Sequence, residues 1–119
     1  MANVNLKSLT TVLGENASIA DIPTTASGIV TCSSNQVLKI NSLYVSNIDG
    51  TNSATVTADV YDGTNVDSYL VKGLGVGAGG TVNIVTNETS IYINEGQSIR
   101  LTSSASGDLA GFVSYERIS

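Results

Sequence analysis

The tetrapeptide Asp-Gly-Thr-Asn occurs twice, at 49–52 and at 62–65, and a nine-residue run of strict alternation lies between the two copies. Small apolar residues fill one parity of this run, and polar or aromatic residues fill the other. Because successive side chains of a strand point to opposite faces, the run predicts a strand with one apolar face. Asp-Gly accepts positive φ, so each copy predicts a turn that reverses the chain. The sequence therefore predicts a β-meander centred on residues 53–61.

The remainder of the chain shows the same strand character, and no window carries the i, i+3, i+4, i+7 spacing of a helix. An extended segment is expected at 6–13, ended by a break at Gly14-Glu15-Asn16. Further strands are expected at 29–32, 37–48, 66–72, 81–85, 90–93, 97–103 and 109–118. Turn-like residues separate them at intervals of roughly 8 to 13 residues. This pattern predicts an all-β fold, an antiparallel β-sandwich of about eight strands, and a jelly roll is one topology that fits.

The longest apolar run, 37–48, changes phase midway. Leu38 and Ile40 share one parity, whereas Leu43 and Val45 share the other. A β-bulge near Asn41-Ser42 would bring all four to the core side, because one added residue resets the facing of those that follow. A central strand buried on both faces explains the pattern equally well.

The length predicts a single domain. Residues 1–24 have an irregular pattern and include the only proline, Pro23, so we expect an N-terminal extended arm or edge strand there. Residues 25–119 are expected to form the β-sandwich domain.

Composition limits the possible functions. Ten acidic and five basic residues give a net charge of −5. A nucleic-acid-binding protein needs a basic surface, so we expect no nucleic-acid partner. The chain has no histidine, which removes the commonest general base and metal ligand, and its only cysteine, Cys32, is expected to be a buried hydrophobe. No apolar run is long enough to cross a membrane and no secretory signal is visible, so we expect a protein made in the cytoplasm that does not bind membranes.

Three patterns could carry chemistry, and each has a simpler structural interpretation. The glycine-rich segment 73–80 would need a helix behind it to cradle a phosphate, but a strand is expected at 81–85. The Asp-Gly-Thr-Asn copies could ligate calcium, yet each supplies one carboxylate, and turns explain them better. Asp59 and Asp67 could form a hydrolytic carboxylate pair, although an exposed polar face accounts for both. We therefore expect no enzyme, no cofactor and no metal ion.

Binding by surface contact remains the simplest function for such a chain. Tyrosines occur in several of the expected strands, where they either pack at the rim of the core or anchor an interface. Tyr61 is the best candidate for exposure, because it shares the polar parity of the 53–61 strand. The candidate contact surface consists of Thr55, Thr57, Asp59 and Tyr61.

Several stretches resemble small β-sandwich virion proteins of tailed bacteriophages, especially phages of aquatic bacteria such as cyanophages. They are Lys-Ile-Asn-Ser-Leu-Tyr-Val-Ser-Asn at 39–47 followed by the first Asp-Gly-Thr-Asn, Thr-Ser-Ile-Tyr-Ile at 89–93 with Glu95-Gly96, Ala-Ser-Gly-Asp-Leu at 105–109 and Ser-Tyr-Glu at 114–116. The resemblance covers most of the chain beyond about residue 25. It transfers no catalytic or binding residue.

The resemblance implies a capsid decoration or cement protein on the exterior of the virion, with the major capsid protein and further copies of itself as partners. A trimer is the oligomer expected by analogy. Two alternatives stay open: a structural protein of the neck, tail or fibre base, and a virion carbohydrate-binding module.

Overall fold

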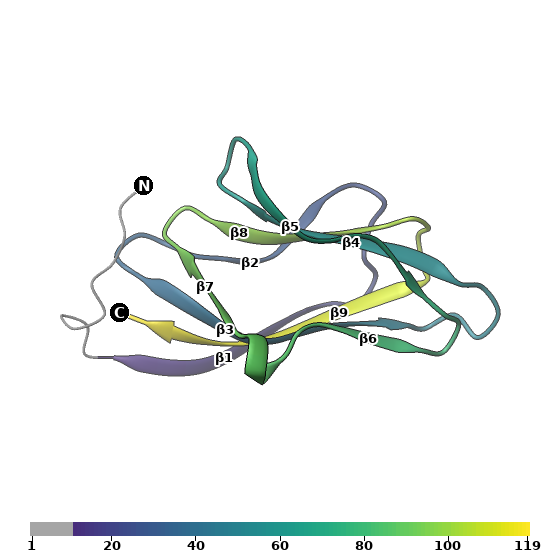
Figure 1. Cartoon of the computed structure of the whole chain (residues 1–119), viewed down its shortest axis with the longest axis horizontal. Helices are drawn as coiled ribbons and strands as arrows, with labels where there is room; N and C mark the ends of the chain where they lie inside the picture. The colour runs from purple at the N-terminus through teal and green to yellow at the C-terminus, as the bar shows by residue number, and fades with distance from the viewer. Residues whose placement is uncertain (1–10) are drawn as a thin grey trace.

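Two antiparallel β-sheets lie face to face in the computed structural model, which describes residues 11–119 (Figure 1). One short 3-10 helix, η2 (Asn87–Thr89), accompanies the strands in this part of the chain. The nine strands are β1 (Val12–Ile19), β2 (Ser27–Thr31), β3 (Val37–Asn47), β4 (Ala54–Tyr61), β5 (Val66–Val76), β6 (Thr81–Val85), β7 (Ile91–Asn94), β8 (Ser98–Ser103) and β9 (Leu109–Ile118). The predicted all-β antiparallel sandwich is confirmed.

The five-stranded sheet has the order β1-β9-β3-β6, with β7 also paired to β3, and the four-stranded sheet has the order β2-β8-β4-β5. β7 pairs with the first half of β3 and β6 with the second half, so the two short strands follow one another along one edge. The chain repeatedly passes from one sheet to the other, and the inner faces of both sheets enclose a single apolar core. Within residues 11–119, no helix is long and apolar enough to span a membrane.

Of the two explanations for the change of phase in the long apolar strand, the structure shows the β-bulge. The pairing of β3 with β9 shifts register between Ile40 and Ser42, which leaves Asn41 as the extra residue. Leu38, Ile40, Leu43 and Val45 are all at most 1% exposed. The bulge therefore keeps both halves of the strand directed at the core despite the change of parity.

The strand between the two tetrapeptides forms as predicted, and its apolar residues are buried: Ala54, Val56, Ala58 and Val60. The second tetrapeptide closes the β4–β5 hairpin, where the Asp62 amide donates to the Asn65 carbonyl at 3.0 Å. The first tetrapeptide does not reverse the chain within a sheet. It connects β3 in one sheet to β4 in the other, so the predicted meander is wrong at this end.

The long-range partners of the two loops explain this difference. The Asn47 side chain, at the end of β3, donates to the carbonyls of Asn52 and Val76, at 2.9 and 3.0 Å. The Gly79 amide donates to the Asp49 carbonyl at 3.2 Å. These bonds tie the first loop to the end of β5 and to the loop before β6, and they direct the chain across the sandwich.

The glycine-rich segment 73–80 lies partly in a strand and partly in a loop. β5 continues through Gly73 and Gly75 to Val76, because Leu74 and Val76 alternate with the glycines and pair with Val56 and Ala54 of β4. The turn itself is confined to 77–80, and the strand expected at 81–85 follows as β6.

The N-terminal prediction is wrong in one respect. Gly14-Glu15-Asn16, expected to be a break, lies in the middle of β1, which pairs continuously with β9 along the edge of the five-stranded sheet. Residues 1–10, which hold most of the extended segment expected at 6–13, lie outside the described residues. The division of the chain at residue 24 stays a prediction.

Candidate functional site

The four residues of the predicted contact surface lie on the outer face of the four-stranded sheet, between β5 and β8. Thr55 is exposed, Thr57 and Tyr61 are half-buried, and Asp59 is buried. The Thr57 hydroxyl accepts a hydrogen bond from the Gly73 amide at 3.1 Å and so ties β4 to β5. The strand thus presents a surface that is partly covered by its own neighbours.

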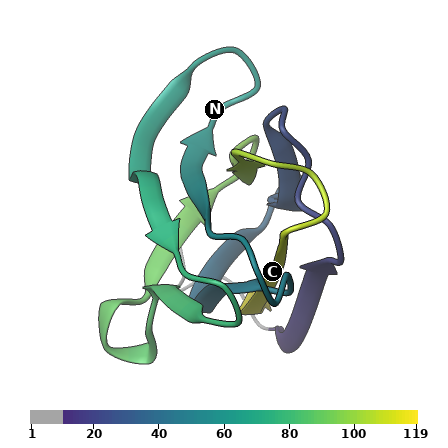
Figure 2. The same ribbon diagram turned by 90° about the vertical axis from the view of Figure 1, so that its right-hand side faces the viewer.

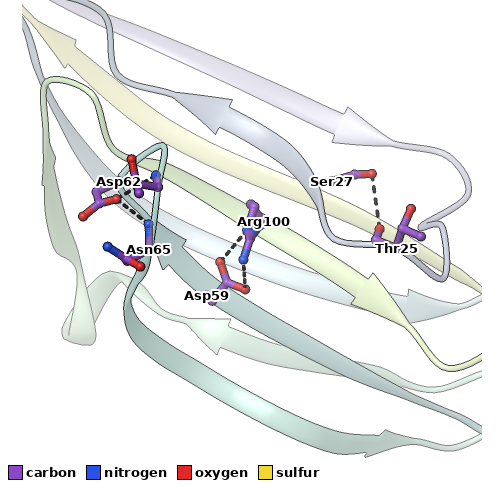
Figure 3. Close-up of polar contacts among 7 residues, drawn as sticks. Thr25, Ser27, Asp59, Asp62, Asn65 and Arg100 are labelled. Atoms are coloured by element: carbon purple, nitrogen blue, oxygen red, sulfur yellow. Dashed lines mark hydrogen bonds and ion pairs between the residues drawn. The ribbon is translucent and has the colours of Figure 1, made fainter.

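Asp59 is only 3% exposed, which contradicts its predicted place on an exposed polar face. It lies directly opposite Arg100 of β8. Both nitrogens of one guanidinium edge donate to the carboxylate, Nε to Oδ1 at 2.9 Å and Nη2 to Oδ2 at 3.1 Å (Figure 3). Such two-bonded geometry fixes both side chains, and the hydrogen bonds with Asp59 raise the pKa of Arg100.

The Arg100 guanidinium also lies over the Tyr61 ring, 3.8 Å from its centroid. On the other side of Asp59, Tyr69 of β5 is its cross-strand neighbour, and the Lys72 ammonium lies 4.8 Å from the Tyr69 ring centroid. We call these five residues the tyrosine–cation cluster. Cation–π contacts of this kind hold aromatic rings in defined orientations.

Arg100, Tyr69 and Lys72 were not predicted as part of this surface. Arg100 lies between the buried residues Ile99 and Leu101, so the alternation in β8 indicates that it faces outward. That it lies opposite Asp59 follows only from the register of β4 with β8. No pattern within either strand specifies this register.

The tyrosines differ widely in exposure, and Tyr61 is not the most exposed, contrary to the prediction. Tyr69 and Tyr92 are 48% and 52% exposed, whereas Tyr115 is buried. Tyr44 stacks on Phe112 across β3 and β9, with 5.5 Å between ring centroids. Of the two tyrosines in the tyrosine–cation cluster, Tyr69 is therefore the one more accessible to a partner.

The carboxylates of Asp59 and Asp67 do not act as a pair. Asp59 binds Arg100, while the Asp67 carboxylate accepts a hydrogen bond from the Gln97 side chain at 2.8 Å. Residues 11–119 contain no detectable pocket. Cys32 is 1% exposed, as expected for a buried hydrophobe, and its burial raises the pKa of its thiol.

Both tetrapeptides form the same side-chain turn. The Asp49 carboxylate accepts hydrogen bonds from the amides of Thr51 and Asn52. The Asp62 carboxylate accepts them from Thr64 and Asn65, and Figure 3 shows this second turn. These bonds lower the pKa of both aspartates. In the described part of the chain, no three acidic or thiol side chains gather as a metal site would require. The turn interpretation accounts for the geometry of both loops, and a calcium titration followed by melting temperature tests the alternative of a calcium site.

Three acidic residues from separate loops interact electrostatically at one end of the sandwich. Desolvation raises the pKa of Asp108 above its ordinary 3.8, and the hydrogen bond and charge of Asp49 and the charge of Asp21 raise it further. A raised pKa in the folded state means that folding favours the protonated form of Asp108. Protonated Asp108 contributes fully to stability at a pH below its pKa in the unfolded chain. This contribution is lost as the pH rises through its pKa in the folded chain.

We therefore expect Asp108→Asn to be more stable than the original chain at pH 7 and equal to it near pH 3. Urea denaturation at the two pH values measures the difference. Equal stability at both values would contradict the repulsion inferred at this end of the sandwich.

The comparisons with known proteins provide a structural likeness. No protein family model matches the chain, and no curated protein sequence matches it. A solved structure of similar fold comes from Bacillus endospore appendages, described as a novel family of disulfide-linked pili. The two chains are 18% identical, the match covers 98% of this chain and 95% of the other, and the TM-score is 0.55. At this identity the likeness shows the fold alone.

Proposed function

We propose that the chain is a non-enzymatic structural subunit of a large assembly and, more specifically, a decoration protein on the exterior of a tailed-phage head. The observation that carries this proposal is the tyrosine–cation cluster on the outer face of the four-stranded sheet. The strand order also supports a jelly-roll topology. If β6 and β7 are counted as one interrupted strand, the two sheets have four strands each, in the orders β1-β9-β3-β6/β7 and β2-β8-β4-β5.

The cluster has the chemistry of a protein contact site. Tyrosine and arginine are the residue types that most often dominate binding energy at protein interfaces. Here Tyr61, Asp59 and Arg100 hold one another in place through the ion pair and the ring contact. A surface ordered before binding loses less conformational entropy on association. Tyr69 and Lys72 supply the exposed part that a partner would cover.

The charges of the cluster favour contact over catalysis. A catalytic carboxylate or cation needs a free side to meet its substrate. Asp59 instead uses both oxygens for Arg100, and Arg100 is covered on one face by Tyr61. The major capsid protein is the partner that the sequence resemblance implies. A subunit that binds only the assembled shell would stabilise that shell by mass action.

A filament subunit is the second candidate, favoured by the likeness to a pilus protein over nearly the full length of both chains. That neighbour is described as disulfide-linked. This chain has one cysteine, and Cys32 is 1% exposed. One thiol allows at most one bond to another copy, so disulfides alone could not join each subunit to two neighbours. A filament of this chain would require noncovalent contacts.

The location of the protein in its native particle tests the proposal. Electron microscopy with a label on the chain is expected to show density repeated over the whole head. Density confined to one vertex, to the tail or to a separate filament would contradict decoration.

Substitution at the cluster tests the surface itself. We expect Tyr69→Ala to weaken binding to purified heads by about 30-fold, the loss of a hot-spot residue worth roughly 2 kcal/mol. Tyr92→Ala is the matched control, because this tyrosine has similar exposure but lies on the other sheet. A co-sedimentation titration measures both variants. Equal affinities for the two would exclude the cluster as the contact site.

A further inference from the structure

The edge strands of the two sheets differ in their protection against pairing with another chain. β2, β6 and β7 are short, with five, five and four residues. β5 is long, but its pairing shifts register three times and it carries Lys72. Short length, bulges and lysine are the usual means by which proteins block edge pairing. β1 has eight residues, no register shift, no proline and no lysine.

The pairing of β1 with β9 determines which backbone groups of β1 have no partner within residues 11–119. Thr11 and Ser119 exchange both of their backbone hydrogen bonds, at 2.8 and 2.9 Å. In an antiparallel ladder such pairs alternate with pairs whose amides and carbonyls point away from one another. The continuous register therefore directs the amides and carbonyls of four residues to the open edge: Val12, Gly14, Asn16 and Ser18.

The low charge of the β1 edge also permits pairing with a second copy. With a net charge of −5, two copies repel one another in general. Glu15 is the only charged residue of β1, and its carboxylate forms an ion pair with Arg117 of β9 at 2.6 Å. Val12 and Leu13 are 61% and 49% exposed, so apolar surface is available beside the free backbone groups. Figure 2 shows β1 at the outer margin of its sheet.

We infer that β1 pairs antiparallel with β1 of a second copy about a two-fold axis and so joins two five-stranded sheets into one. The register centred on Asn16 fits best, because it places Leu13 opposite Ile19 and Glu15 opposite Ala17 of the other copy. Centring on Glu15 would instead oppose two carboxylates directly, which is unfavourable. The resulting assembly is a dimer rather than the trimer expected by analogy. It leaves the tyrosine–cation cluster, on the other sheet, free.

Proline substitution at Asn16 tests this pairing with little effect on the fold. The Asn16 amide points away from β9, so proline removes a donor that has no backbone acceptor within residues 11–119. Sedimentation velocity of the full chain over a concentration series is expected to show a dimer, and Asn16→Pro is expected to raise the dimer dissociation constant by more than ~10-fold. Asn16→Ala keeps the amide and is expected to dimerise as the original chain does.

Amide hydrogen exchange provides a readout that needs no substitution. The amides of Gly14, Asn16 and Ser18 are expected to exchange slowly at high protein concentration and rapidly on dilution. A monomer at every concentration, or a dimer unaffected by Asn16→Pro, would overturn the inference. So would slow exchange that does not depend on concentration, since the edge would then be covered within a single chain.

Discussion

Replacing Arg100 with methionine is expected to lower the free energy of unfolding by about 3 kcal/mol, the low end of the cost of breaking a buried ion pair. The methionine keeps the apolar stem but leaves the Asp59 side chain, which is 5% exposed, without its cation. Removing the other partner should cost less. After Asp59→Asn, the Arg100 side chain is still 22% exposed and still lies on the Tyr61 ring. Urea denaturation measures both losses.

The double variant Asp59→Asn/Arg100→Gln serves as the control for the expected difference in cost between the two single substitutions. It removes both charges together, so it is expected to be more stable than Arg100→Met. If Arg100→Met cost no more than Asp59→Asn, the buried carboxylate would not depend on the guanidinium, and the rigidity ascribed to the cluster would be wrong.

Leu101→Ala is expected to cost about 3 kcal/mol, because it opens a cavity in a closely packed core. Leu101 is fully buried in β8, one of the central strands of its sheet. Gly111 of β9 faces it from the other sheet, and a Cβ at that position would lie 2.7 Å from the Leu101 Cδ1 atom. Gly111→Ala alone is therefore expected to cost roughly 1 kcal/mol through overpacking.

The two substitutions should be coupled. In the Leu101→Ala background the new methyl group at position 111 enters the vacated space, so Gly111→Ala should there cost nothing or stabilise the protein. A double-mutant cycle followed by thermal and urea denaturation measures the interaction. Additive losses would mean that the two sheets do not meet at this point as described.

The sequence was informative where the structure depends on neighbours along the chain. The bulge in β3 was one of two explanations that the sequence allowed, because the apolar parity changes between Ile40 and Leu43 and an added residue keeps both on one face. The buried face of β4 followed from plain alternation. Leu74 and Val76 carry the same signal, but the glycines between them concealed the end of β5.

The sequence was uninformative where the structure depends on partners that are distant along the chain. The two tetrapeptides make the same aspartate side-chain hydrogen bonds, yet one closes a hairpin and the other crosses between sheets. Gly63 of the second has a positive φ of 97°, whereas the first is held by Asn47 and Gly79. Likewise, Thr55, Thr57 and Tyr61 face outward with the parity predicted, but the burial of Asp59 depends on Arg100. No local pattern contains that information.

The strand order also determines when this chain can fold during its synthesis. Among the described strands, only the neighbours β4 and β5 pair directly with one another, whereas β9 lies between β1 and β3. A nascent chain that has not yet released β9 from the ribosome holds two strands of the five-stranded sheet without their common partner. Folding that depends on such distant pairings is slow and leaves strand edges open in the meantime. The β4–β5 hairpin can form early, but the sandwich closes only when β9 inserts between β1 and β3, which are synthesised long before it.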